Sequence, residues 1–454
     1  MVKQYSSHIK RTFSIAGPCI FENLMISMVI YADAMMVGSL GKTATASIAI
    51  NNSPMWVLNA LPIALSVGGT VLVARNIGAE NRSAASNIAT QTMGASFIFG
   101  TIVSVIMILI SGFIPRLMGA EQDILPDAVA YLRIVSFSLA AHFSGLVAAG
   151  LLRGSGDTKT PMIISLFTNV ISIVGNYFLI YPTRYVDYLP FQVWGADLGV
   201  TGAAISTAFA QTLSGIILSL YIFRSSRNLN LNYKDTFKIQ NDTMKKVLAI
   251  GIPSSLERLS GSLGQVFFHK IVSGLGTAAV AAHYIATTAE SISYMPANGF
   301  SVASTTLIGH SLGAKNKNDA IIYSKISIIG ACAVGALAGL SFYIFSPQMV
   351  AIFTPDQEVR DLAANSLRVM SIGQVFSSFA IVSVGIFRGA GDTKFPLIAS
   401  TVGIWGARLI SAYYFAYTLG WGLVGAWLGM AIDFVARTIV FSIRYFRMKW
   451  VDVK

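Results

Sequence analysis

Long apolar segments alternate with short polar ones along almost the whole chain. Most are about 20 residues or longer, the length that a helix needs to cross a bilayer core. The pattern predicts an all-α polytopic membrane protein. The predicted spans cover roughly residues 13–37, 47–74, 89–113, 129–151, 161–182, 199–223, 246–271, 279–308, 322–346, 363–387, 396–418 and 423–446.

The chain also repeats itself at an offset of 235 residues. Residues 153–159 (RGSGDTK) return as residues 388–394 (RGAGDTK), and Glu22 returns as Glu257. Solenoid repeats have periods of about 20–50 residues, so this long period indicates two similar halves. Each half holds six predicted spans, an even number that returns the chain to its starting side. The pattern therefore predicts two pseudo-symmetric six-helix bundles arranged as a parallel repeat, which is typical of some transporters.

One long polar stretch divides the two halves. We expect residues 1–223 to form the N-terminal bundle, residues 224–245 a cytoplasmic linker and residues 246–454 the C-terminal bundle. The first half also carries about twelve extra residues between its fifth and sixth spans, around residues 181–197.

Composition and charge agree with a membrane protein. The chain is 54% hydrophobic and only 11% charged, whereas soluble domains have about 25% charged residues. Most of the 32 Lys and Arg residues fall in loops on the side of the N-terminus, which predicts that both termini are cytoplasmic in a plasma or inner membrane. Basic inner loops beside anionic lipid explain the net charge of +12 without a nucleic-acid partner.

The sequence does not favour an enzyme or a bound cofactor. The two cysteines lie in predicted spans and the five histidines are scattered, so neither a disulfide framework nor a metal-ligand pattern is present. Residues 154–157 and 389–392 match the Gly-x-Gly-Asp motif of intramembrane aspartyl proteases. Both copies lie among Arg and Lys in predicted cytoplasmic turns, where no buried pair of carboxylates can form.

Three motifs together resemble those of the MATE (multidrug and toxic compound extrusion) family. They are residues 31–41 (YADAMMVGSLG), residues 74–81 (ARNIGAEN) and the doubled RGxGDTK loops. The resemblance implies an exporter that takes up H+ or Na+ while it expels amphipathic, often cationic compounds, and we expect it to work as a monomer. A flippase for lipids or lipid-linked oligosaccharides, from the same superfamily, is the alternative. Such a cavity needs several cationic side chains, and only Arg258 and Arg408 are clearly within the membrane.

Acidic residues inside the spans are the first candidates for coupling to a cation. An ionisable side chain at mid-bilayer costs about 2.5–3.5 kcal/mol on insertion scales, so its presence indicates function. Asp33 matches the acidic residue of the first span in the family. Neutralisation of this carboxylate by a proton or a cation would change which packing the helices prefer, as an antiporter requires. The alternative is a buried acid that a hydroxyl or amide satisfies.

Polar residues on neighbouring spans are predicted to complete the site. Ser172 and Asn176 share one face of the fifth span with Asn169, and Thr207 lies on the sixth. In some family members the position of Asn176 is a second aspartate, and Ser172 aligns with an asparagine. This chain differs at both positions, which leaves either a proton on Asp33 or Na+ bound by Asp33 and Asn176, because hard cations prefer oxygen ligands. An inert polar face is the alternative for the span-five residues.

The other acids allow two interpretations each. Glu22 and Glu257 lie in the inner halves of their helices and serve either as gate or substrate contacts or as symmetric structural hydrogen-bond partners. Glu290 is a candidate for cation or substrate contact. For Asp433, which has an arginine four residues later, an ion pair is the simpler account. Methionines that include Met25 and Met28 crowd the first span and form either a pliable substrate lining or a lipid-facing or core surface.

Overall fold

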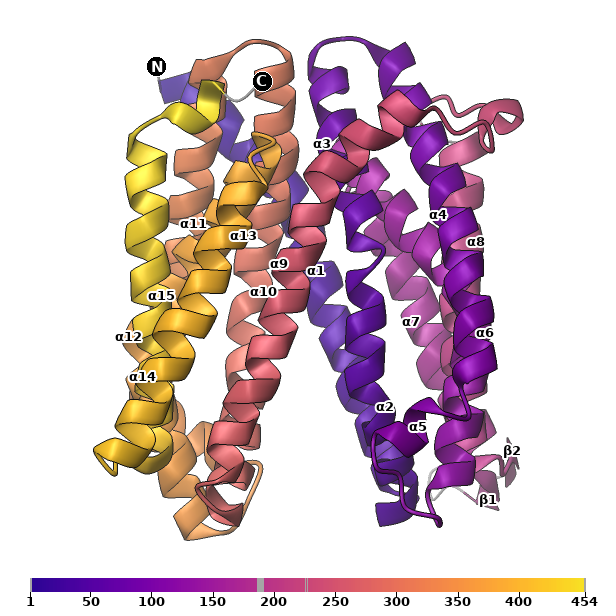
Figure 1. The fold of residues 1–454 in the computed structure, drawn as a ribbon, viewed down its shortest axis with the longest axis vertical. Coiled ribbons are helices and arrows are strands. Elements are labelled where there is room, and N and C mark those ends of the chain that lie inside the picture. Colours follow the sequence, from indigo (N-terminus) through magenta and orange to yellow (C-terminus); the bar gives the residue numbers. More distant parts are fainter. Residues whose placement is uncertain (1, 186–191, 225, 227, 453–454) are drawn as a thin grey trace. The chain divides into compact units, whose positions relative to one another are not determined.

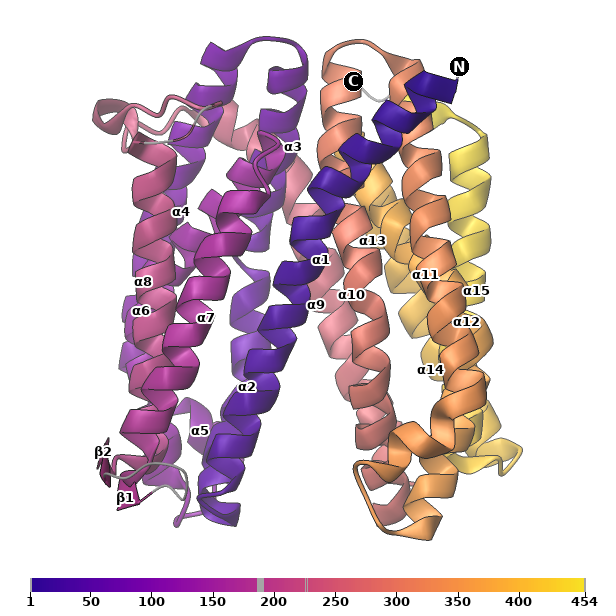
Figure 2. The same ribbon diagram turned by 180° about the vertical axis from the view of Figure 1, so that it is seen from behind.

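The computed structural model describes residues 2–185, 192–224, 226 and 228–452, and almost all of them are helical (Figures 1 and 2). The first half holds α1 (Val2–Gly38), α2 (Lys42–Ala60), α3 (Ile63–Gly78), α4 (Arg82–Ile110), α5 (Ile114–Leu117), α6 (Leu125–Gly154), α7 (Lys159–Ile180) and α8 (Gly199–Arg224). The short 3-10 turn η1 (Tyr233–Asp235) follows. The second half holds α9 (Asn241–Ser273), α10 (Thr277–Gly313), α11 (Lys317–Ala351), α12 (Gln357–Gly389), α13 (Lys394–Val402), η2 (Gly403–Arg408), α14 (Leu409–Tyr413), η3 (Tyr414–Thr418), α15 (Gly422–Phe446) and η4 (Lys449–Asp452).

Every predicted span falls on a helix or on a run of consecutive helices, which confirms the predicted fold class. Among the described residues, ten such segments are long and apolar enough to cross a membrane. α9 and α10 carry the seventh and eighth predicted spans. They have 33 and 37 residues, as long as these ten segments, but their sequences are too polar to be counted among them. The second span is divided into α2 and α3 at Leu61 and Pro62, since proline cannot donate the backbone hydrogen bond that a helix interior requires.

The chain forms two compact units that do not follow the repeat boundary strictly. Unit 1 contains residues 1–20, 74–81 and 249–454, and unit 2 contains residues 21–73 and 82–248. The predicted linker and the first turns of α9 therefore belong to unit 2, whereas the first half of α1 belongs to unit 1. Of the predicted linker, residues 225 and 227 lie outside the described residues.

In unit 1 the two ends of the chain meet at the start of α11. His8 on α1 lies 3.0 Å from the carboxylate of Asp319, and Lys317 forms an ion pair with Asp452. The N- and C-terminal segments thus lie on the same side, as an even number of spans requires. The interior of the unit is filled by large apolar side chains such as Trp427.

In unit 2 a small apolar cluster joins α1, which carries Asp33, to α7 and α8. Val37 on α1, Ile180 on α7 and Ala203 on α8 are all buried in it. Because Val37 is one turn after Asp33, this cluster fixes the distance of the Asp33 backbone from α7.

The linker lies in fixed register along α4 in the same unit. Ser86 and Thr90, which are one helical turn apart, accept hydrogen bonds from the backbone N–H groups of Asn230 and Asn232. Gly94, one further turn along, leaves room for the backbone of Thr236, since a Cβ there would come within 1.7 Å of the Thr236 carbonyl oxygen. The linker is therefore a strap held to α4 by hydrogen bonds.

The extra segment between α7 and α8 forms a short antiparallel hairpin of β1 (Pro182–Tyr185) and β2 (Gln192–Ala196), in which Arg184 pairs with Val193. The central part of this predicted insertion, residues 186–191, lies outside the described residues.

Candidate functional site

Asp33 and Asn176 meet inside unit 2. The side-chain Nδ2 of Asn176 donates a hydrogen bond of 2.6 Å to Oδ1 of Asp33. Asn176 is buried and Asp33 is only partly exposed. The two residues lie on different helices, α1 and α7, so the contact depends on the packing of the bundle.

The hydrogen bond leaves one oxygen of the pair without a partner. Oδ1 of Asn176 is buried and accepts no hydrogen bond from the described part of the chain. A buried carbonyl oxygen beside a carboxylate is a suitable ligand for a hard cation, and the carboxylate alone can take a proton. The oxygens present thus fit H+ or Na+.

The other predicted members of the site contribute less directly. Within the described residues neither Ser172 nor Thr207 makes a hydrogen bond to the Asp33 carboxylate. The backbone carbonyl of Ser172 accepts a 2.8 Å hydrogen bond from Ser206 and so joins α7 to α8. Tyr131 on α6, which the sequence analysis did not single out, lies close enough to Asp33 to interact with it electrostatically. No motif in the sequence marks this tyrosine.

Glu22 and Glu257 occupy equivalent places in the two halves. In unit 2, Nη2 of Arg153 donates to both carboxylate oxygens of Glu22, at 2.7 and 2.8 Å. In unit 1, Nη2 of Arg388 donates to Glu257 at 2.9 Å, and Ser400 adds a hydrogen bond of 3.1 Å. Each glutamate therefore pairs with the arginine that opens the repeated RGxGDTK loop, a geometry that supports the structural interpretation over a substrate contact.

The aspartates of the same repeated loops lie just before the first turns of α7 and α13. Asp157 accepts hydrogen bonds from the backbone N–H and the hydroxyl of Thr160 in the first turn of α7. Asp392 accepts a hydrogen bond from Arg444 at 2.8 Å in unit 1. Asp392 also accepts a hydrogen bond of 3.4 Å from the backbone N–H of Phe395 in the first turn of α13, so each carboxylate satisfies the start of a helix.

Glu290 is buried in a polar cluster of unit 1. Its carboxylate accepts hydrogen bonds from Tyr294, one turn later on α10, and at 3.2 Å from Nε2 of Gln374 on α12. The amide oxygen of Gln374 in turn accepts from Ser293 at 2.8 Å. The sequence analysis missed Gln374 as a partner, since 84 residues separate it from Glu290.

Asp433 is completely buried between two arginines. Arg408 donates to it at 2.9 Å through Nε, and Arg437 donates through Nε at 2.8 Å and Nη2 at 2.6 Å. Arg408 belongs to η2, a π-helical segment, and Gly403 of the same segment lies directly against the carboxylate. A Cβ on Gly403 would come within 2.5 Å of Oδ1 of Asp433. The geometry agrees with the predicted ion pair.

The methionines of α1 do not share one environment. Met28 is 62% exposed, whereas Met25 is partly buried. Among the described residues, no group of three or more His, Cys, Asp or Glu side chains is placed to hold a metal ion.

Comparison with known proteins gives one consistent result. The model of the MatE family matches residues 18–178 and 253–414, once in each half. Over 97% of this chain and 93% of its own length, the "Probable multidrug resistance protein NorM" of Thermotoga maritima is 29% identical. The "Uncharacterized transporter YisQ" of Bacillus subtilis is 25% identical over 97% of this chain and 94% of its own length.

Solved structures share the fold. A structure described as "Crystal structure of MATE in complex with MaL6" superposes with a TM-score of 0.90 at 23% identity, over 98% of both chains. Another, described as the outward-facing conformation of a multidrug resistance MATE family transporter of the MOP superfamily, gives a TM-score of 0.89 at 23% identity and covers 98% of this chain and 97% of its own.

Proposed function

The chain belongs to the MatE family, and from this premise we propose that it is a cation-coupled multidrug efflux antiporter. It exports amphipathic, often cationic compounds by alternating access of its two bundles, works as a monomer and needs no cofactor. It lies in the plasma or inner membrane with both termini in the cytoplasm. The name of the Thermotoga relative supports drugs as the substrate class, and the distribution of Lys and Arg supports the orientation.

The observation that carries the proposal is the contact between Asp33 and Asn176. A carboxylate inside a membrane bundle costs free energy, and among the described residues the hydrogen-bond donor to Asp33 is the neutral amide of Asn176. No arginine or lysine forms an ion pair with Asp33 within the described residues, so the charge is available to an incoming cation. Each positive charge driven inward gains about 2.3 kcal/mol per 100 mV of membrane potential.

Two coupling ions lead to different chemistry at this contact. A proton on Asp33 removes the charge and turns one carboxylate oxygen into a hydrogen-bond donor. The nearby Oδ1 of Asn176 can accept that hydrogen bond. Na+ instead requires both the carboxylate and Oδ1 of Asn176 as ligands. We therefore expect Asn176→Leu to abolish sodium-driven export, whereas proton-driven export would be weakened but retained.

The test is export of a fluorescent cationic dye from proteoliposomes with either a pH gradient or a sodium gradient. Asp33→Asn should abolish export under both gradients while the protein stays monodisperse. Asp361→Asn, which removes an exposed acid on α12, is the matched control and should export normally. Full export by the Asp33 variant would refute the proposal.

The alternative of a flippase for lipid-linked oligosaccharides receives less support. Such a substrate carries phosphates that need free cationic side chains. Of the two intramembrane arginines that the sequence singled out, Arg408 is bound to Asp433, so Arg258 alone is left as an anion ligand, which is fewer than the several cations that such a cavity needs.

A further inference from the structure

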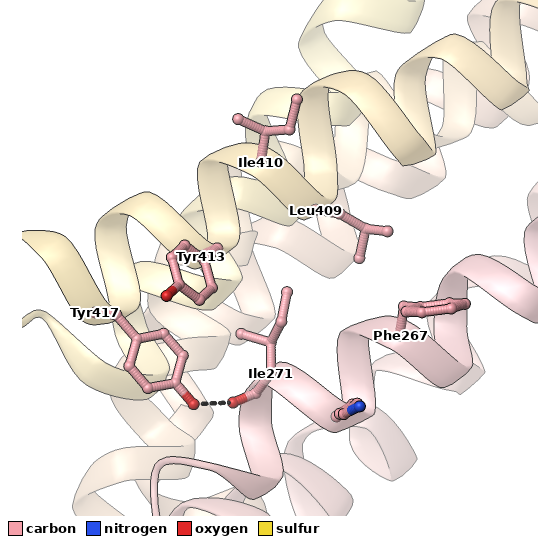
Figure 3. A pocket seen from close by; sticks show the side chains of 7 residues that line it. Phe267, Ile271, Leu409, Ile410, Tyr413 and Tyr417 are labelled. Atoms are coloured by element: carbon pink, nitrogen blue, oxygen red, sulfur yellow. Dashed lines mark hydrogen bonds between the residues drawn. The ribbon is translucent and has the colours of Figure 1, made fainter.

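Unit 1 has an apolar groove between the C-terminal part of α9 and the helix formed by η2, α14 and η3. The groove has a volume of about 530 Å³, within the range of about 300–1,000 Å³ that is typical of ligand sites. Figure 3 shows Phe267 and Ile271 on one wall and Leu409, Ile410 and Tyr413 on the other. An aliphatic chain is the ligand that such walls fit best.

The shape of the groove is fixed by one hydrogen bond across its end. The hydroxyl of Tyr417 donates to the backbone carbonyl of Ile271 at 2.7 Å, as Figure 3 shows. This carbonyl belongs to the last turn of α9, where carbonyl groups lack a partner within the helix. Gly274 leaves room for the tyrosine, because a Cβ there would come within 2.1 Å of the hydroxyl. The groove is thus a built feature of the fold.

A single charged residue, Lys270, lines this groove, and its charge is positive. Its side chain is exposed, and in the part of the chain that the structure describes its ammonium group forms no ion pair. An anionic group at the groove can therefore pair with Lys270 while an apolar chain lies against the apolar walls.

The groove lies where a lipid headgroup would lie. Lys270 is in the last turn of α9, and Tyr413, Tyr414, Tyr417 and Trp421 mark the corresponding end of the neighbouring helix. Tyrosine and tryptophan gather at the level of lipid headgroups, and lysine extends its ammonium group to the same level. In the proposed orientation this end faces the outer leaflet.

We propose that this groove binds one phospholipid with an anionic headgroup from the outer leaflet. One acyl chain lies against Phe267, Leu409 and Ile410, and the anionic headgroup pairs with the ammonium group of Lys270. A cationic exported compound would be repelled by Lys270, which argues against the groove as a substrate site. The inference rests on the chain spanning a membrane in the proposed orientation, and not on the coupling ion or on Asp33.

Native mass spectrometry tests the proposal with phosphatidylglycerol and phosphatidylcholine of identical acyl chains at equal concentration. The unchanged protein should retain phosphatidylglycerol in excess over phosphatidylcholine. Lys270→Glu should lower the retained phosphatidylglycerol at least about tenfold, the effect of 1.4 kcal/mol. Lys42→Glu, the same charge change at the exposed start of α2 in unit 2, should retain the lipid as the unchanged protein does.

A second variant tests the apolar part of the groove. Ile410 is 67% exposed, so Ile410→Trp should fold normally while its indole occupies the groove, and it should lower retention of phosphatidylglycerol. Equal retention in the Lys270 and Lys42 variants would overturn the proposal, as would unchanged retention in the Ile410 variant. Stronger binding of a cationic dye to the Lys270 variant, with lipid retention unaltered, would also overturn it and would assign the groove to exported compounds.

Discussion

Replacing Asp433 with asparagine should strongly destabilise unit 1. The substitution keeps the size of the side chain but removes the negative charge that Arg408 and Arg437 share. Asp433 is 0% exposed and Arg408 is 7% exposed, so water cannot replace the lost carboxylate. Two guanidinium groups would remain beside each other without a counter-charge.

The size of the effect follows from the burial of the pair. Removal of one partner from a buried ion pair costs about 3–5 kcal/mol, chiefly because the remaining charge is left uncompensated. A domain of about 150–250 residues loses roughly 2–4 °C of melting temperature per kcal/mol. The expected decrease in Tm is therefore on the order of 10 °C. Export per folded molecule should persist, because the proposed coupling site lies in unit 2.

The assay heats the purified protein in detergent to a series of temperatures. Size-exclusion chromatography then measures the fraction that stays monodisperse at each temperature, which gives Tm. Asp361→Asn, which changes an exposed acid of the same unit, is the control and should leave Tm within about 1 °C, since most surface substitutions change stability by less than about 0.5 kcal/mol. Replacing Arg408 and Arg437 with methionine and Asp433 with leucine together should recover most of the loss. A Tm equal to that of the control would refute the reasoning.

Two glycine substitutions give further predictions, each with a matched glycine as control. Gly403→Ala should lower the free energy of unfolding by about 1–3 kcal/mol, because the new methyl group would overlap the buried carboxylate of Asp433. Gly406→Ala is the control and should leave the free energy of unfolding unchanged, because the nearest atom to its new methyl group is 3.9 Å away. Equal Tm values for the two variants would contradict the expectation. Gly94→Ala should detach the linker strap from α4, because the methyl group would overlap the carbonyl of Thr236. Trypsin should then cut the linker faster than in the unchanged protein or in Gly112→Ala, which has no neighbour within 4 Å; identical digestion would show that the strap is not held by this contact.

The helices were predictable because their cause is local. An apolar run of about 20 residues has one favourable conformation in a membrane, so the twelve predicted spans coincide with helices to within a few residues at most ends. Two local features escaped this argument. The break of the second span at Leu61 and the π-helical segment around Gly403 depend on how backbone hydrogen bonds are redistributed within an apolar run, which hydropathy does not record.

The side-chain partners were less predictable because they depend on packing between distant segments. The sequence singled out Asp33 and Asn176 separately, and their 143-residue separation gave no measure of the distance between them. Glu290 was a candidate on the ground of its charge alone, whereas its partner Gln374 carries no charge to mark it. Asp433 and Arg437 were the exception, since four residues within one helix place two side chains on the same face.

The duplicated Glu–Arg pair separates what the two halves have in common from what distinguishes them. At the repeat offset, Glu22 corresponds to Glu257, but Asp33 corresponds to Phe268 and Glu290 to Met55. The Glu–Arg pair is therefore common to both halves, whereas each of these intramembrane acids belongs to one half alone. The two lobes share a scaffold but carry different acids, so they are built for unequal tasks.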